Sequence, residues 1–380
     1  MGRRQVIVHF FGQHSNLYQC LNGKHEFADH WVGFWPALRE ELANHDMDLV
    51  VDDGSIQQRP DNILWCIDLP GKRAELLKLL RRIVTKTRVF QQVESPLSHP
   101  ARLNPANIDW AHALISYDKK FLDEANIRLP RPTLFRSLSV SLRRPRSWDN
   151  SWSDRRPITM VNTNQAYGLL RRGVPGSQIA YWYASGFDIR CKDVIEMLSS
   201  ERYGLRRRLA LAVSSSSPKG IPFDSGLDIF GANWTGEPIS WVHRFWRPRS
   251  FPNSKGRLAQ DKLELLTNYR FTVAFENYQG DRNYISEKMI DPILAGSVPI
   301  YLGDACIASV IPSNVFIDAR DFKSIPSLVA FLYRMSESQW ATYFKAGMTF
   351  LATEQALRFC AYEHAKSTAL FLSALSPSHD

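Results

Sequence analysis

Cysteine is scarce in this sequence. Five cysteines are scattered among 380 residues, an odd number with no C-x-x-C pair. This usage argues against a disulfide framework and against a zinc site built from cysteines. We therefore expect the protein to work in a reducing, cytoplasmic compartment.

Long hydrophobic runs are missing as well. No stretch approaches the roughly 20 apolar residues that a membrane-spanning helix requires. The amino-terminal segment "MGRRQVIVHFFG" contains an apolar run that is too short for a signal peptide. We interpret this run as the first strand of the fold.

Acidic residues are outnumbered by basic ones. Lys and Arg number 47 against 38 Asp and Glu, a formal net charge of +9. This balance favours an anionic partner: a nucleic acid, an acidic membrane face or a phosphorylated small molecule. Hydrophobic residues make up 44% and charged residues 22% of the chain, which is typical of a globular protein, and the length indicates two domains.

Short β-rich runs alternate with helical patterns along the first part of the chain. Helices are expected at 34–45 and 72–83, and strands at 5–11, 48–53, 62–69, 87–94 and 111–117. Such alternation predicts parallel strands joined by crossover helices, the doubly wound α/β class.

The alternation returns after a segment rich in Arg, Pro, Ser and Trp (143–157), which we interpret as an interdomain linker. Strands are then expected at 158–162, 227–231, 269–276, 298–303 and 314–319, and helices at 200–213, 261–268, 324–335 and 353–372. The predicted units are an amino-terminal domain (1–150), a carboxyl-terminal domain (151–352) and a terminal helix with its tail (353–380). Two such domains place a ligand cleft between facing strand ends.

One segment, "FENYQGDRNYISEKMIDPILAGSVPIYLG" (275–303), lies at such a strand end. The preceding strand is expected to bring Glu276 and Asn277 to the cleft. Lys288 follows in the first turn of the next helix, where free N–H groups and the helix dipole favour a phosphate. Glu287 beside it can accept hydrogen bonds from sugar hydroxyls. The segment lacks both G-x-G-x-x-G and the Walker pattern, so it cannot be assigned to dinucleotides or ATP.

The start of that helix is expected near Tyr284, with Asp281 or Asn283 as its cap. An ordinary strand–helix–strand unit with a solvated Glu-Lys pair is the alternative interpretation of the same residues.

The stretch "YRFTVAFENYQGDRNYISEKMIDPILAGSVPIYLGD" closely resembles the donor-binding signature of the α-1,3/4-fucosyltransferases, glycosyltransferase family 10. That signature runs YKF-x-x-x-FEN(S/T), a short loop, Y-(V/I)-(T/S)-EK and AG-x-VP-(V/I)-x-x-G. Similar flanking stretches extend the resemblance over roughly the carboxyl half. It implies a GT-B-like fold of two Rossmann-like domains and GDP-fucose as donor. By motif position it assigns donor contacts to Asn277, Tyr284, Glu287 and Lys288.

The resemblance also implies an arginine that holds the donor diphosphate from the first helix of the carboxyl-terminal domain. In "GLRRRLALAV" the best match is Arg206, although Arg207 and Arg208 leave the register open. A solvated or membrane-facing edge is the alternative for these arginines. One position departs from the family: Tyr278 stands where Ser or Thr is usual. The shape of the sugar pocket is therefore left open, and a related GDP-sugar is an alternative donor.

Transfer from a GDP-sugar needs cations for the departing diphosphate and a base for the acceptor hydroxyl. The base should lie across the cleft, and "VFQQVESPLSHP" places Glu94 at a strand end in the amino-terminal domain. The family's proposed base is a glutamate in a comparable stretch. Glu94 is therefore the predicted base, and a single carboxylate opposite the leaving group implies inversion to an α-linked product. A solvated glutamate that closes a strand is the competing interpretation.

No cofactor is required by the sequence. Asp52 and Asp53 before Gly54 are typical of a turn, so we predict no protein-built metal site, although Mg²⁺ or Mn²⁺ could assist departure of the diphosphate. The implied partners are GDP-fucose and an oligosaccharide or glycolipid acceptor, with transfer α-1,3 to a GlcNAc-type sugar. This fits lipopolysaccharide biosynthesis or protein glycosylation.

Two stretches interleave Arg with Trp and Phe, at 134–148 and 241–250. They could contact an anionic inner-membrane face peripherally. They also leave a nucleic-acid-binding module as an alternative from another class, although no nucleic-acid fold signature accompanies them. A third alternative keeps the GT-B architecture with another nucleotide sugar.

Overall fold

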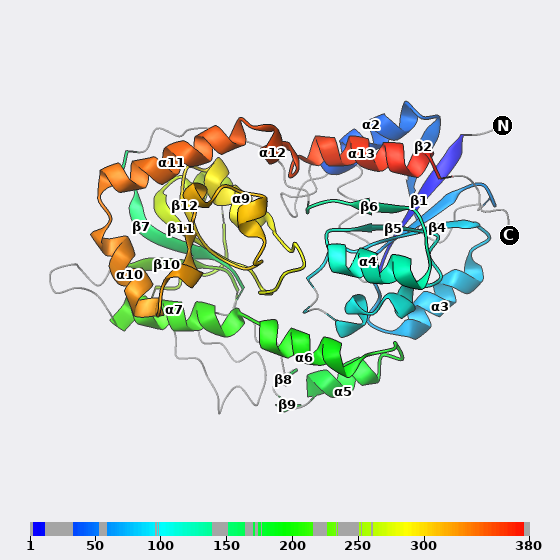
Figure 1. Cartoon of the computed structure of the whole chain (residues 1–380), viewed down its shortest axis with the longest axis horizontal. Coiled ribbons are helices and arrows are strands. Elements are labelled where there is room, and N and C mark those ends of the chain that lie inside the picture. The colour runs from blue at the N-terminus through cyan, green and yellow to red at the C-terminus, as the bar shows by residue number, and fades with distance from the viewer. Residues whose placement is uncertain are drawn as a thin grey trace.

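The computed structural model describes residues 3–11, 33–52, 59–95, 97, 99–138, 151–163, 170–171, 174–175, 177–215, 226–232, 234, 251, 253–259 and 261–375. Most of the expected linker and the whole Arg- and Trp-rich stretch 241–250 lie outside these residues. The described residues form two lobes, each built on its own sheet (Figure 1).

The first lobe contains a six-stranded sheet of order β2-β1-β3-β4-β5-β6, in which every neighbouring pair is parallel. The strands are β1 Arg4–Phe10, β2 Met47–Val51, β3 Ile63–Ile67, β4 Thr87–Gln91, β5 Ala113–Ser116 and β6 Thr133–Phe135. All residues of β3 and β5 are buried. A parallel sheet of this kind requires helices on both faces.

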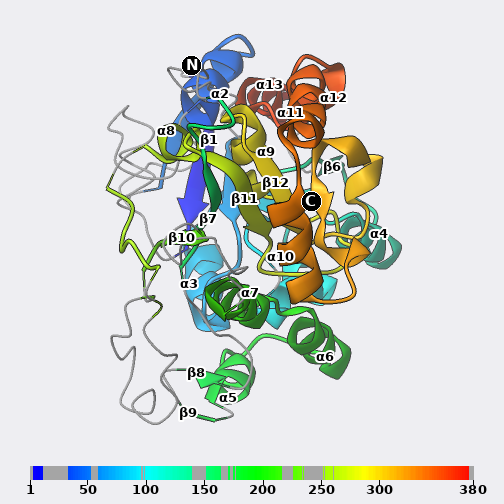
Figure 2. The same ribbon diagram turned by 90° about the vertical axis from the view of Figure 1, so that its left-hand side faces the viewer.

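Those helices come from distant parts of the chain. One face is covered by α2 Phe34–Ala43 and α13 Ala361–Ser373, and the other by α3 Arg73–Arg82 and α4 Lys119–Arg128. The small residues Ala361, Ala365 and Ala369 repeat every four positions on α13 and lie in the same cluster as Trp35 and Leu38 of α2. This spacing puts them on one helix face, which lets α13 pack closely on α2 (Figures 1 and 2).

The second lobe contains a five-stranded parallel sheet of order β10-β7-β11-β12-β13. The strands are β7 Arg156–Val161, β10 Leu227–Phe230, β11 Tyr269–Phe275, β12 Val298–Leu302 and β13 Ile317–Asp318. Helices α7 Tyr203–Ser215 and α10 Ile325–Arg334 cover one face. Helices α8 Lys262–Leu266, α9 Glu287–Leu294 and the end of α11 Glu337–Leu351 cover the other.

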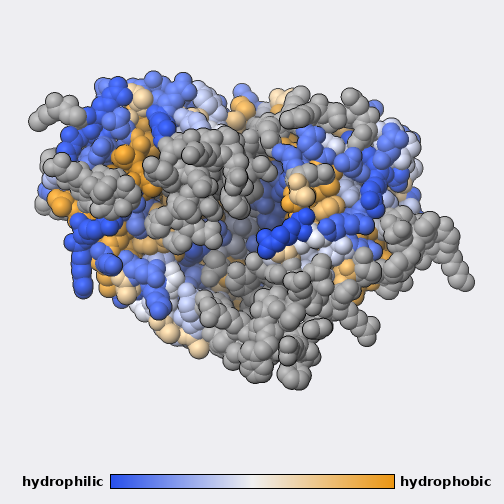
Figure 3. All heavy atoms as spheres, turned by 180° about the vertical axis from the view of Figure 1, so that it is seen from behind, coloured by the Kyte–Doolittle hydropathy of each residue, from blue (hydrophilic) through white to orange (hydrophobic). Residues whose placement is uncertain are grey.

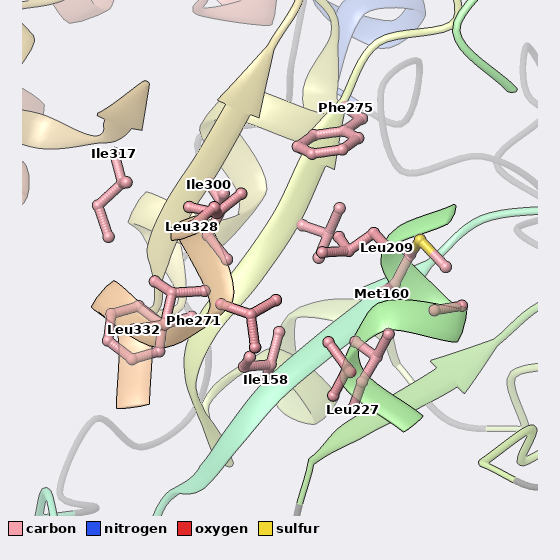
Figure 4. Packing of buried hydrophobic residues seen from close by; sticks show 14 of the residues in the cluster. Ile158, Met160, Leu209, Leu227, Phe271, Phe275, Ile300, Ile317, Leu328 and Leu332 are labelled. Carbon is pink, nitrogen blue, oxygen red and sulfur yellow. The ribbon is translucent and has the colours of Figure 1, made fainter. Parts of the chain in front are cut away.

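The core on the α7 and α10 face is made of apolar side chains from all five strands and both helices. Figure 4 shows Phe271 and Phe275 of β11 in this cluster, with Leu209 of α7 and Leu332 of α10. Burial of such side chains contributes about 1.5–3 kcal/mol each before entropy is counted. This packing fixes the end of β11, where the candidate site begins.

Shorter elements lie between or beside the lobes. They are α5 Ser177–Tyr183, α6 Cys191–Ser200, α12 Glu354–Leu357, the strand pair β8 Leu170–Arg171 and β9 Val174–Pro175, and short 3-10 helices at Pro100–Leu103, Pro105–Ile108, Ile307–Ser309, Ser313–Val315 and Ala319–Asp321. A cluster at the junction joins Tyr117 of the first lobe, Met197 of α6 and Tyr278 of the second lobe.

The expected fold class is confirmed: two doubly wound parallel sheets and a terminal helix. The sequence patterns missed β6, α4, α6 and α11. They also predicted one helix at 353–372, whereas α12 ends at Leu357 and α13 begins at Ala361. The break has a clear cause, because Phe359 is buried in the second-lobe core whereas Ala361 packs in the first. The chain crosses between lobes there.

The surface of the described residues is mixed. Figure 3 shows hydrophilic and hydrophobic residues interspersed over both lobes as seen from behind. Among the described residues, the helices are all too short or too polar to traverse a bilayer.

Candidate functional site

The turn from β11 into α9 is organised by Glu276. This side chain is fully buried and accepts hydrogen bonds from the Ser286 amide and hydroxyl, each at 2.7 Å. Ser286 in turn caps α9 by accepting the Lys288 N–H at 3.4 Å. The helix therefore begins at Glu287, not near Tyr284 as expected. Glu276 lies beneath the turn and is not exposed at the cleft, which corrects its expected position.

The loop before α9 is held by Asp304, which follows β12. Its buried carboxylate accepts the Tyr284 N–H at 3.2 Å. Asn283 adopts φ 64°, a left-handed conformation that Asn tolerates. With the loop fixed in this way, Ser286 is the N-cap, and the expected caps Asp281 and Asn283 do not serve.

Lys288 lies within a charged cluster at the first turn of α9. Its Nζ is 3.6 Å from the carboxylate of Glu276, 3.0 Å from Ser286 Oγ and 3.3 Å from Glu287 Oε1. Burial raises the pKa of Glu276, while Lys288 acts to lower it. Glu287 also lies 3.8 Å from the amine of Lys262. The cluster fixes one cation beside the amino terminus of a helix, an arrangement that favours a phosphate.

Arg206 reaches from α7 to the carboxyl end of β11. It is 2% exposed, and its Nη2 donates to Asn277 Oδ1 at 2.8 Å and to the carbonyl of Phe275. Its Nε has no hydrogen-bond partner among the described residues. Arg207 is half-buried and Arg208 is exposed. Of the three candidate arginines, Arg206 is therefore the one that contacts predicted donor residue Asn277.

Two tyrosines attach this loop to neighbouring elements. The Tyr284 ring lies edge-on to Tyr117 of the first lobe, with ring centroids 5.2 Å apart. Tyr278 is 1% exposed, and its hydroxyl donates to Glu196 of α6 at 2.5 Å. Tyr278, at the position where the family usually has Ser or Thr, thus packs a large side chain against α6.

Arg282 connects three elements, although no sequence pattern marks it as a site residue. Its Nη1 donates to Asp118 at 2.9 Å, and its Nε and Nη2 donate to Glu196 at 2.5 and 2.9 Å. Asp118 caps α4 in the first lobe, and Lys120 of that helix pairs with Asp281 beside it. The partners are 164 and 86 residues away in sequence, so no local pattern could have indicated this ion cluster.

Asp118 should make the stability of the protein depend on pH. Burial raises its pKa from 3.8 to about 6, although Arg282 opposes the shift. Between these values the folded chain binds a proton that the unfolded chain releases, so stability falls as pH rises. We expect Asp118→Asn, which keeps an N-cap acceptor, to remove this loss, worth about 3 kcal/mol. Thermal unfolding from pH 4 to pH 7 measures this loss. The unfolding temperature of the wild type should fall relative to that of Asp118→Asn as the pH rises.

The matched control is Asp123→Asn on the exposed side of α4. Its unfolding temperature should run parallel to that of the wild type over the same range. Parallel curves for Asp118→Asn as well would contradict the prediction.

Glu94 lies on the opposite wall of the site, after β4. Its amide donates to the Asp68 carboxylate at 3.1 Å, and its carbonyl accepts the Tyr117 hydroxyl at 2.9 Å. The Glu94 side chain is exposed, and its carboxylate makes no hydrogen bond to the described residues. The backbone is thus held in place while the carboxylate can accept a proton from a ligand.

The Glu94 carboxyl lies within electrostatic range of Lys288 and Glu287 of α9. Desolvation raises its pKa first, and Asp68 and Glu287 add to the rise, whereas Arg102 and Lys288 oppose it. The residue reaches solvent, yet protein surrounds the carboxyl on most sides. Two of the predicted donor residues, Lys288 and Glu287, thus act on the carboxyl of the predicted base. A raised pKa suits a general base that works near neutral pH.

Asp68 is a further residue of this wall, and it was not among the predicted site residues. It follows β3 with φ 58° and is 8% exposed. Its carboxylate accepts the amides of both Val93 and Glu94 and lies 4.0 Å from Arg102. An aspartate directly after the buried run "ILWCI" was a signal for a strand-end functional position.

A pocket that is open to solvent lies at the carboxyl end of the first-lobe sheet, with Glu287 of α9 on its far side. Its lining comes from the carboxyl ends of β4, β5 and β6 and from α9, through Gln91, Gln92, Val93, Ile115, Ser116, Tyr117, Arg136, Ser137, Leu138 and Glu287. The two residues before Glu94 therefore line the same hollow as Glu287 of α9.

Of the acidic pair Asp52 and Asp53, which was weighed as a metal site, the structure describes only Asp52. Asp52 is bound by His9 Nδ1 at 2.7 Å and Arg82 Nη2 at 2.5 Å, and Asp53 lies outside the described residues. Within the described part of the chain, no three His, Cys, Asp or Glu side chains are grouped as a metal site would require.

Sequence comparison finds known proteins that are similar to part of this chain, mostly within the second lobe. Residues 248–366 match the family model of the carboxyl-terminal part of glycosyltransferase family 10 (fucosyltransferase). The chain is 39% identical to bovine alpha-(1,3)-fucosyltransferase 7 over 105 residues, which cover 26% of this chain and 30% of that protein. It is 32% identical to alpha-(1,3)-fucosyltransferase FucT of Helicobacter pylori over 83 residues, covering 22% and 17%. The matches thus span less than a third of these relatives.

The whole chain has a structural counterpart. A crystal structure of an α1,3-fucosyltransferase with GDP superposes with a TM-score of 0.53 at 13% identity, covering 100% of this chain and 93% of that one. This likeness shows the fold, which is GT-B, with two Rossmann-like lobes facing a cleft.

Proposed function

We propose, because residues 248–366 match the family model of the carboxyl-terminal part of glycosyltransferase family 10, that the protein transfers L-fucose from GDP-fucose to a hydroxyl of a glycan, with inversion. The proposed product is an α-1,3 linkage to a GlcNAc-type sugar. The observation that carries the mechanism is the position of Glu94, which interacts electrostatically with Lys288 and Glu287 from the opposite wall.

In the proposed reaction Glu94 takes the proton of the acceptor hydroxyl. The acceptor oxygen forms a bond to the anomeric carbon of fucose, and the bond from that carbon to the β-phosphate oxygen breaks. GDP departs with the electron pair of that bond. Lys288, the α9 amino terminus and Arg206 stabilise the charge that develops on the diphosphate.

On the donor side, Asn277, Tyr284 and Glu287 complete the proposed binding site. Arg206 orients the amide of Asn277 at 2.8 Å, and Tyr117 supports the ring of Tyr284. Glu287 lies at the pocket, where a carboxylate can accept hydrogen bonds from sugar hydroxyls.

A panel of nucleotides tests the donor. We expect GDP and GDP-fucose to raise the unfolding temperature, because ligand at 100 times its Kd adds about 2.7 kcal/mol to stability. UDP, CMP and a single-stranded DNA oligonucleotide should raise it far less. If UDP alone raises the unfolding temperature, the donor is a UDP-sugar and not GDP-fucose. Stabilisation by DNA alone would favour the nucleic-acid-binding alternative.

A further inference from the structure

The pocket beside Glu94 contains a buried arginine that the proposed chemistry does not use. Arg136 follows β6 and is 9% exposed. Its Nη1 donates to the His364 carbonyl at 3.2 Å and to the Thr368 hydroxyl, both on α13, and its guanidinium lies 5.0 Å from the centre of the Phe34 ring. These contacts anchor α13, but they occupy only one end of the guanidinium.

The other edge of Arg136, formed by Nε and Nη2, has no partner among the described residues, and no carboxylate there pairs with this arginine. Burial without a counter-ion lowers the pKa of Arg136 to about 9. A buried cation is normally paired, since leaving it alone is costly. The Nε–Nη2 edge is the planar fork that binds a carboxylate through two hydrogen bonds.

Two glutamine amides in the same pocket also lack partners. Gln91 is 4% and Gln92 is 1% exposed. Gln91 Oε1 and Gln92 Nε2 are buried without a hydrogen bond to described residues, whereas Gln92 Oε1 accepts the Ser116 hydroxyl at 2.7 Å. Both glutamines line the pocket, so each brings a side chain with an unmet hydrogen bond to it, in addition to the arginine.

We propose that this pocket binds the acceptor through a carboxylate, so that the acceptor is an acidic saccharide of the hexuronic acid kind. The carboxylate pairs with the Nε–Nη2 edge of Arg136, and the amides of Gln91 and Gln92 turn toward hydroxyls of the same saccharide. This inference rests on the proposed transferase function and names the class of its acceptor.

The arrangement of strands sets the distance between the carboxylate and the reacting hydroxyl. Glu94 follows β4 and Arg136 follows β6, with β5 between them. Two strand spacings amount to roughly 10 Å. The carboxylate thus belongs to the accepting sugar or to the sugar next to it. Glu287 on the far wall does not cancel the arginine, because Lys288 and Lys262 lie within 3.3 and 3.8 Å of its carboxylate.

Three matched disaccharides test the proposal with the full chain. They are a hexuronic acid–N-acetylhexosamine, its neutral analogue in which CH₂OH replaces the carboxylate, and the 6-phosphate of that analogue. Calorimetry with and without GDP gives their Kd values. We expect the carboxylate form to bind at least about tenfold more tightly than the neutral one, the effect of one charge-assisted hydrogen-bond pair. Equal affinities, or tighter binding of the phosphate, would overturn the proposal.

Two variants locate the effect. Arg136→Lys keeps the charge but loses the two-pronged guanidinium edge. The ratio of the Kd of the neutral disaccharide to the Kd of the carboxylate form should therefore fall toward one. Gln91→Glu leaves the bonds from Arg136 to α13 intact and supplies a competing carboxylate within the pocket. It should abolish the preference, whereas the exposed control Gln355→Glu on α12 should retain it. Full preference in Gln91→Glu would contradict the assignment.

Binding of GDP is measured in the same samples. If GDP binds and the disaccharides show no preference, only the acidic acceptor is excluded. If GDP does not bind, the transferase function fails, while the measurements without GDP still decide whether the pocket prefers a carboxylate.

Discussion

Glu94→Gln is expected to lower kcat for fucose transfer by about 10²–10⁴-fold, the usual contribution of a positioned general base. The amide keeps the size of the side chain but cannot take the acceptor's proton. Asp68 and Tyr117 bind only the backbone of Glu94, so the fold and the GDP affinity should be retained. Steady-state kinetics with saturating donor, together with a GDP titration, separate these effects.

The pH profile gives an independent readout of the same residue. Glu94 must be ionised to act, and its pKa is raised by desolvation and by Asp68. Activity in the wild type should therefore fall as pH decreases through this raised pKa, and Glu94→Gln should lose that acid limb. The control is Glu75→Gln on the exposed face of α3, which should leave both kcat and the profile unchanged. Near-normal transfer by a folded Glu94→Gln variant would remove Glu94 from the mechanism.

Lys288→Met is expected to lower kcat by about 10²–10³-fold, because one preorganised cation contributes about 2.7–4 kcal/mol to the transition state. The variant should also bind GDP more weakly. We expect it to fold, since Glu276 keeps two hydrogen bonds from Ser286 and can take up a proton once the neighbouring cation is gone. Lys288→Arg, which preserves the charge, should retain more activity than Lys288→Met.

The control for this charge removal is Lys345→Met on the exposed side of α11. Its kcat and GDP affinity should match those of the wild type. A folded Lys288→Met variant with kcat within about twofold of the wild type would show that the cation does not stabilise the departing diphosphate.

The sequence predicted the elements that position the site better than it predicted their contacts. Strand periodicity located β11 closely, whereas β4 ends at Gln91 and not at Glu94 as expected; Glu94 and Asn277 follow the two strands by a few residues. The start of α9 was wrong because the cap is chosen by Glu276 and Asp304, which bind residues 10 and 20 positions away. Local capping rules cannot include partners at such separations.

Local pattern by itself determined the two doubly wound sheets, the turn that carries Lys288 and the position of Glu94 near the end of its strand. Periodicity and turn chemistry act over a few residues and are written directly in the chain. Only the tertiary structure decided which groups meet: Arg282 with Asp118 and Arg136 with α13. These pairs are 164 and more than 200 residues apart in sequence. Which polar groups pair and which stay without a hydrogen bond therefore depends on how the folded chain packs.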